Sequence, residues 1–129
     1  MTGSELFLYS LIALVAFFGI RRFLWTLKIP QYNPANIAEK LSSKASLVLL
    51  DVRTNSERRN GAIRDSVHIP LHELGRRMNE LEKLRDKEIV VYCQSGNRSL
   101  TAAVKLRKNG FSAANLKGGI AEWNFQNRS

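Results

Sequence analysis

Cysteine is almost absent from this 129-residue sequence, in which Cys93 is the only one. A single thiol cannot form an intramolecular disulfide, which excludes a disulfide-stabilised scaffold. With only His68 and His72 beside it, Cys93 cannot complete an ordinary structural zinc site, so we expect neither a metal nor a cofactor. A lone cysteine is most often a small buried apolar residue, and its neighbours must decide whether it reacts.

Acidic residues are also scarce, at 11 against 20 Lys and Arg, which gives a net charge of +9. This balance favours anionic partners such as acidic lipid surfaces, nucleic acid or small anions, although a merely basic surface fits it too. The basic pairs Arg58-Arg59, Arg76-Arg77 and Arg107-Lys108 carry no interleaved aromatic residues, so we expect no nucleic-acid partner. They could instead hold the chain against anionic lipid head groups.

Only one long apolar run is present, from Leu6 to Ile20, and it contains no charge. As a helix it covers roughly 22 Å, less than the ~30 Å hydrocarbon core of a bilayer. If Arg21 and Arg22 extend toward the head groups, the helix can continue to Leu27 and place Trp25 at the interface. We therefore predict a transmembrane anchor helix over residues 5–27.

Two other interpretations of this run are open, a buried core helix and a cleaved signal peptide. The signal peptide is disfavoured because Glu5 precedes the run and no A-x-A cleavage site follows it. Arg21, Arg22 and Lys28 all follow the run, so the positive-inside rule places the rest of the chain in the cytoplasm and the N-terminus outside. The free thiol agrees with a reducing compartment.

The residues after the anchor predict a linker over 28–33, where Pro30 precedes Pro34, and one domain over 34–129. Within the domain, apolar strands are expected at 46–50, 67–69, 88–92 and 111–116. Helices are expected from Pro34, from the capping box Thr54-x-x-Glu57, over 71–84, over 99–109 and after Gly118-Gly119. Such alternation predicts an α/β fold with a small parallel sheet covered by helices on both faces.

The segment Cys93-Gln94-Ser95-Gly96-Asn97-Arg98-Ser99 follows one of these strands, at the sheet edge where sites form in parallel α/β proteins. A small loop that opens a helix can turn its backbone amides inward and bind an anion. The helix N-terminus and Arg98 should stabilise a thiolate, so we expect the pKa of Cys93 to fall. Packing of Cys93 under apolar side chains would have the opposite effect.

Two chemistries use a thiolate in an anion-binding loop. In one, the cysteine accepts a sulfane sulfur as a persulfide and passes it on; in the other, it hydrolyses a phosphate ester through a cysteinyl-phosphate. Cys93 and Arg98 are separated by four residues, whereas the cysteine phosphatases resemble a pattern with five. A tighter loop suits a single sulfur atom better than a tetrahedral phosphate.

Four motifs occur in order: LLDVR at 49–53, Gly61-Ala62-Ile63 with His68-Ile69-Pro70, CQSGNRS at 93–99 and GGIAEW at 118–123. Together they resemble the single-domain rhodanese-like proteins over almost the whole of the domain. The resemblance implies a rhodanese-like fold and a sulfurtransferase that passes sulfane sulfur through a Cys93 persulfide. It also implies that Asp51 and Arg53 support the cysteine loop rather than react.

The implied partners are a small anionic sulfur donor such as thiosulfate and a thiol or protein acceptor, in a bacterial membrane setting. No second cysteine can resolve the persulfide within the chain, so the acceptor must be external. A second hypothesis is a membrane-tethered sulfur-relay or binding module with little turnover of small donors. Two departures from the family pattern are Arg58, where an aromatic residue is common, and Asp65-Ser66, where Gly-Ala is usual.

Overall fold

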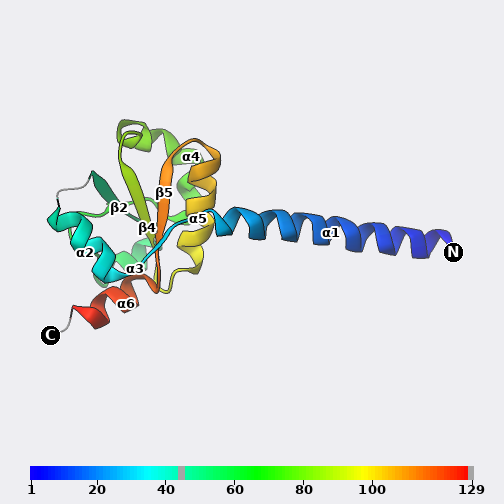
Figure 1. Ribbon diagram of the computed structural model, residues 1–129, viewed down its shortest axis with the longest axis horizontal. Coiled ribbons are helices and arrows are strands. Elements are labelled where there is room, and N and C mark those ends of the chain that lie inside the picture. The colour runs from blue at the N-terminus through cyan, green and yellow to red at the C-terminus, as the bar shows by residue number, and fades with distance from the viewer. Residues whose placement is uncertain (44–45, 128–129) are drawn as a thin grey trace.

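The computed structural model describes residues 1–43 and 46–127 as one α/β domain preceded by a long helix (Figure 1). The strands are β1 Gln31–Tyr32, β2 Leu47–Asp51, β3 Val67–His68, β4 Glu88–Tyr92 and β5 Ser112–Leu116. The α-helices are α1 Gly3–Leu27, α2 Pro34–Ser42, α3 Asn55–Arg59, α4 Leu74–Arg77, α5 Asn97–Lys108 and α6 Gly119–Gln126. The 3₁₀ helices η1 Leu71–Glu73 and η2 Met78–Leu84 flank α4.

All described strand pairs are parallel, in the order β1-β5-β4-β2-β3, which confirms the predicted parallel sheet. The central strands β2 and β4 are the apolar runs LVLL and IVVY, each followed by a functional candidate. Asp51 ends β2 and Cys93 comes directly after β4. Because parallel strands end at the same edge, the two residues reach one side of the sheet.

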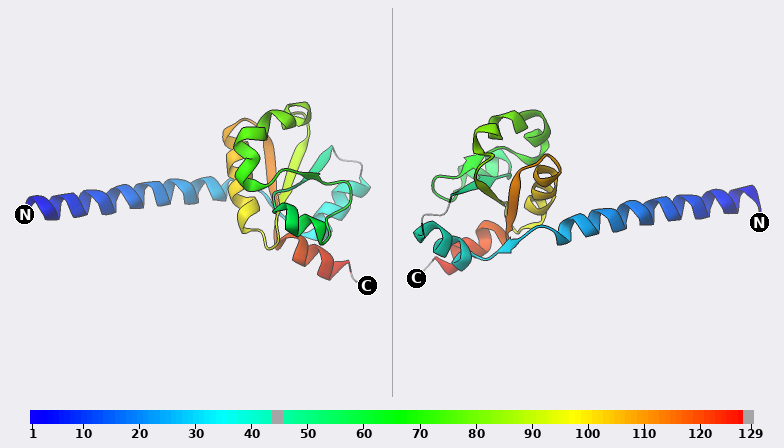
Figure 2. Two further views of the ribbon diagram at one scale, coloured as in Figure 1. Left: turned by 180° about the vertical axis from the view of Figure 1, so that it is seen from behind. Right: turned by 45° about the horizontal axis from the view of Figure 1, so that its top comes forward.

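Alternation along β4 divides the core into two layers, with helices on both faces of the sheet (Figure 2). Ile89 and Val91 pack in the layer beneath α4 and α5. Val90 and Tyr92 face the opposite layer, which α2 and α6 cover. Cys93 belongs to the first of these layers, so apolar side chains pack around it.

The segment expected to be a linker, 28–33, contains part of the sheet. β1 pairs with β5, with Gln31 opposite Asn115, and Ile29 is buried in the core. Two residues are too short for a periodic signal, which explains why the sequence pattern showed only the two flanking prolines.

The expected helix over 71–84 is instead divided into η1, α4 and η2. Its charged side chains pair at spacings of both three and four, as in Glu73–Arg76, Arg77–Glu80 and Glu73–Arg77. The apolar stripe predicted over this segment nevertheless faces the core through Leu74 and Leu81.

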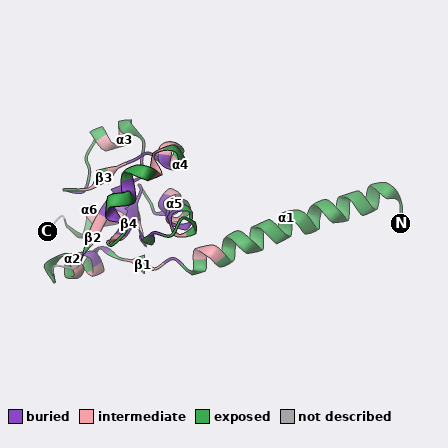
Figure 3. Cartoon of the chain, turned by 90° about the horizontal axis from the view of Figure 1, so that it is seen from above, coloured by how far each residue is buried: buried purple, intermediate pink, exposed green. Residues whose placement is uncertain are grey.

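Helix α1 extends away from the domain and is exposed along nearly its whole length (Figure 3). It is long and apolar enough to cross a membrane, with a mean hydropathy of 1.8 over its most apolar window, and none of that window is buried. The helix therefore does not form part of this chain's core. A membrane span and a signal sequence both fit it. Trp25, expected at a membrane interface, packs against the domain core.

Candidate active site

The cysteine loop crosses from the end of β4 to the start of α5 in a tight curve. Gly96 caps α5 with a φ of 105°, in the left-handed region that favours glycine. Helix α5 begins at Asn97, two residues before the predicted start, so the last residues of the loop already belong to its first turn. This geometry turns the amides at the helix N-terminus toward Cys93.

Two backbone amides and one hydroxyl group contact the sulfur of Cys93. The backbone amides of Gly96 and Ser99 donate to Sγ at 3.1 and 3.4 Å, and the Ser99 hydroxyl lies 3.3 Å away. Cys93 itself is only 1% exposed, so these protein groups take the place of water around the sulfur.

Burial raises the pKa of the Cys93 thiol, while the hydrogen bonds lower it. The Ser99 hydroxyl lowers it most, followed by the amides of Ser99, Gly96 and Ser95, and the net pKa lies below the ordinary value. The sequence predicted two opposite effects on the pKa of Cys93, and both are present. The loop hydrogen bonds lower this pKa by more than burial raises it.

The carbonyl groups of the loop are bound on its outer side. The amides of Ile120 and Ala121, at the start of α6, donate to the carbonyl oxygens of Cys93 and Gln94 at 2.9 and 3.2 Å. Gly119 permits this approach, because a Cβ there would lie 2.5 Å from both oxygens. The late Gly-Gly motif thus holds the loop with its carbonyl groups away from the sulfur.

Asn115 on β5 completes this arrangement and was not singled out by the sequence. Its Nδ2 donates to the Gly96 carbonyl at 3.1 Å and to Gln31 Oε1 at 2.9 Å. Its Oδ1 accepts from the Ser99 hydroxyl at 2.6 Å. Asn115 is 2% exposed, so a buried amide connects Gln31 of β1 to the hydroxyl that contacts the sulfur.

Arg98 lies beside the loop but faces a carboxylate. Its two terminal nitrogens donate to Glu57 Oε1 and Oε2, each at 2.7 Å, which is a bidentate ion pair. The pair holds the pKa of Glu57 at about 2. The sequence marked Glu57 only as the end of a capping box, which it does form with Thr54. Arg98, expected to face an anion, is paired here with the Glu57 carboxylate of α3.

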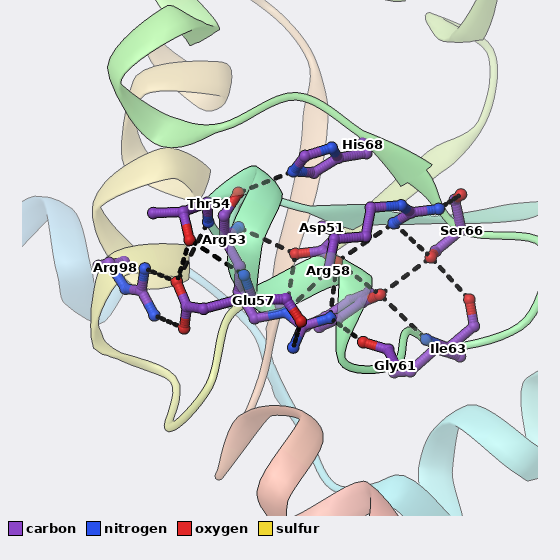
Figure 4. Close-up of polar contacts among 11 residues, drawn as sticks. Asp51, Arg53, Thr54, Glu57, Arg58, Gly61, Ile63, Ser66, His68 and Arg98 are labelled. Atoms are coloured by element: carbon purple, nitrogen blue, oxygen red, sulfur yellow. Dashed lines mark hydrogen bonds and ion pairs between the residues drawn. The ribbon is translucent and has the colours of Figure 1, made fainter.

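Asp51 and Arg53 form a buried ion pair at the end of β2 (Figure 4). Asp51 is fully buried and also accepts from the Tyr92 hydroxyl at 3.1 Å. Arg53 donates to the carbonyl oxygens of Glu57 and Gly61. The network therefore fixes α3, which in turn holds Arg98 through Glu57.

The two departures from the family pattern meet in the same network. Arg58 donates to Asp51 Oδ2 at 3.1 Å and to the Ser66 carbonyl at 2.8 Å. Ser66 also lies 2.9 Å from the Tyr92 hydroxyl. Asp65 has a φ of 64°, a left-handed conformation where the resembling proteins carry glycine and which Asp tolerates. Arg58 and Ser66 thus contribute polar contacts to the Asp51 network.

The remaining loop side chains form an accessible rim around the enclosed sulfur. Gln94, Ser95 and Asn97 are exposed, whereas Gly96 and Ser99 are buried. A cavity of about 320 Å³ adjoins the loop at Gln94. Its lining includes Arg53, Glu57, Gly61, Ile120 and Asn124.

The parallel sheet places Cys93 at the carboxyl end of its central strand, where loop amides donate to the sulfur. The Rhodanese-like domain family matches residues 34–126, and the chain belongs to this family. It is 33% identical over 96 residues to a protein named sulfurtransferase from Allochromatium vinosum, covering 74% of this chain and 88% of that one.

Solved structures agree with the predicted fold. A rhodanese-related protein from Thermoplasma volcanium has a TM-score of 0.69 at 34% identity, covering 76% of this chain and 93% of that chain. A rhodanese-like domain protein from Staphylococcus aureus has a TM-score of 0.68 at 25% identity, with 74% and 91% covered. The rhodanese-like fold is confirmed, and the relatives support sulfur transfer in general.

The Asp51 network predicts a large effect on stability. Asp51→Asn leaves the buried Arg53 guanidinium without its counter-charge, so we expect the free energy of unfolding to fall by about 3 kcal/mol. Urea denaturation of the full chain in detergent measures it. Glu80→Gln makes the same chemical change in an exposed ion pair and should barely alter stability. Equal losses in the two variants would contradict the account.

The Ser99 hydroxyl is expected to set the reactivity of the thiol. Ser99→Ala removes the hydroxyl whose contact with Sγ lowers the pKa of Cys93 most, so the pH midpoint of Cys93 alkylation by iodoacetamide should move upward. Ser95→Ala removes an exposed hydroxyl and keeps the backbone amide, so its midpoint should stay at the wild-type value. An unchanged midpoint in Ser99→Ala would show that the hydroxyl does not act on the sulfur.

Proposed function

We propose that the protein is a sulfurtransferase in which Cys93 carries the transferred sulfur as a persulfide. The observation that carries the proposal is the enclosed sulfur of Cys93, which receives amide hydrogen bonds from Gly96 and Ser99. These donors favour the thiolate, which is the nucleophilic form of cysteine. An anionic donor would reach the sulfur by way of the remaining loop residues, which are Gln94, Ser95, Asn97 and Arg98.

With thiosulfate as donor, the Cys93 thiolate attacks the outer sulfur atom. A bond forms between the two sulfurs, the bond from the outer sulfur to the sulfonate group breaks, and sulfite leaves with the electron pair. An acceptor thiolate then attacks the terminal sulfur and returns Cys93 as a thiolate. Each step exchanges one sulfur bond for another, so neither an oxidant nor a reductant is consumed.

The arginine contacts favour sulfur transfer over phosphate-ester hydrolysis. Both terminal nitrogens of Arg98 are held by Glu57, so this side chain does not point at the loop as a free phosphate ligand. Asp51 and Arg53 act in this proposal as supporting residues that fix α3 and hence Arg98. The domain that carries the chemistry is proposed to extend over residues 34–129, of which 44–45 and 128–129 lie outside the described residues.

A sulfur-relay module is the second candidate, and the exposure of the loop favours it. Cys93 is 1% exposed, whereas the side chains around it are accessible. A protein donor could bind this rim and deliver sulfur from its own persulfide, with little turnover of small donors.

We further propose that α1 anchors the domain in a bacterial membrane, with the domain in the cytoplasm. The support is the exposed apolar surface of α1 and the basic residues Arg21, Arg22 and Lys28 at its end. A green fluorescent protein fused after Ser129 should fluoresce in the membrane fraction of bacterial cells. A soluble fluorescent product, or a membrane-bound dark one, would contradict the anchor or its orientation.

Mass spectrometry of the intact chain tests the persulfide directly. After incubation with thiosulfate, wild type should gain the mass of one sulfur atom, and cyanide should discharge it. Cys93→Ser should gain nothing. If the gain occurs only with a persulfidated protein as donor, the relay module is supported; if it occurs with neither donor, the sulfurtransferase proposal fails.

A further inference from the structure

A second cavity is lined by residues of α1 and α5. These two helices lie next to each other on the side of the domain from which α1 departs (Figure 1). Its volume is about 250 Å³. It is lined by Arg22, Thr26, Thr101, Val104, Lys105 and Lys108. Three of these residues are cationic and none is acidic. Among the residues that the structure describes, none of the three cations forms an ion pair with a carboxylate.

The cationic side chains in and beside this cavity contact hydroxyl and aromatic groups rather than carboxylates. Arg22 donates to the Thr101 hydroxyl at 3.0 Å, so the hydrogen of that hydroxyl can be donated to a ligand oxygen. The ammonium groups of Lys28 and Lys108 lie 4.6 and 5.3 Å from the centre of the Trp25 ring. Val104 and the aliphatic stems supply an apolar wall beside these charges.

The position of the cavity along α1 indicates the class of ligand. About 20 helical residues span a hydrocarbon core of ~30 Å, so a helix that enters at Gly3 leaves the core near Arg22. Trp25 and Lys28 then lie at the depth of the lipid head groups, where tryptophan and basic residues accumulate. The cavity has an apolar wall and a cationic rim, as the boundary between head group and acyl chain requires.

We propose that this cavity binds the phosphate of an anionic phospholipid head group. The inference rests on the proposed membrane anchoring, and it adds a lipid site between α1 and α5. A bound lipid would join the two elements through Arg22, Lys105 and Lys108. Helix α5 carries the cysteine loop at its other end, so the lipid would hold the domain at a set orientation to the membrane.

The test uses the full chain in nanodiscs of equal parts phosphatidylglycerol and phosphatidylcholine, followed by native mass spectrometry of the released protein. Wild type should retain phosphatidylglycerol in preference. Lys105→Gln/Lys108→Gln should lower the ratio of the two retained lipids by about 25-fold, because each basic residue near an anionic surface contributes roughly fivefold. Lys83→Gln/Lys117→Gln removes two exposed lysines outside the cavity and should keep the wild-type ratio.

Absence of a preference in wild type, or equal losses in the two double variants, would overturn the proposal. Displacement of the lipid by millimolar glycerol phosphate would also overturn it, because the ligand would then be a soluble phosphate. Failure to recover the chain in nanodiscs would remove the anchor and this site together.

Persulfide formation is measured on the same samples. Loss of persulfide with an intact lipid preference would sink the sulfurtransferase proposal and leave the lipid site standing.

Discussion

The orientation of three peptide groups in the cysteine loop is the constraint on which the rest of the site depends. The carbonyl oxygens of Cys93 and Gln94 are held by the first amides of α6, and that of Gly96 is held by Asn115. Because the Gln94 carbonyl is bound outside, the Ser95 amide of the same peptide group faces the sulfur. Together with the amides of Gly96 and Ser99 and the Ser99 hydroxyl, it outweighs the effect of burial on the pKa of Cys93. A rotated peptide would place a carbonyl dipole against the thiolate instead. The sheet, the Gly118-Gly119 turn and β5 therefore all contribute to the reactivity of one atom.

Much of the fold follows from patterns that are local in the sequence. Apolar runs such as IVVY in β4 are long enough to predict strands, and their alternation with amphipathic segments predicts a parallel sheet. The misses also have local causes. β1 is two residues long and is recognised as a strand only by its pairing with β5. The segment 71–84 has helical periodicity, but it is divided between 3₁₀ and α winding, which an apolar stripe does not distinguish.

In the candidate site, the sequence could predict the nucleophile and its loop but not their long-range partners. Cys93 is marked by its position between a strand and a helix. Glu57 is marked only as a helix cap, and its ion pair with Arg98 joins residues 41 positions apart. Asn115 is an isolated polar residue in an apolar strand, a signal that could have suggested a buried hydrogen-bonding role. Such partners follow from the packing of strands and loops, which sequence spacing alone does not define.

The thiolate titration of the wild-type chain tests the central claim most directly, because every contact described at the loop acts on the ionisation of Cys93. Ultraviolet thiolate absorbance would be followed against pH, with Cys93→Ser as the blank. The account predicts a single titration with its midpoint clearly below the ordinary thiol pKa of 9.0. A midpoint at or above that value would show that burial dominates over the loop hydrogen bonds. It would contradict the assignment of Cys93 as an activated nucleophile.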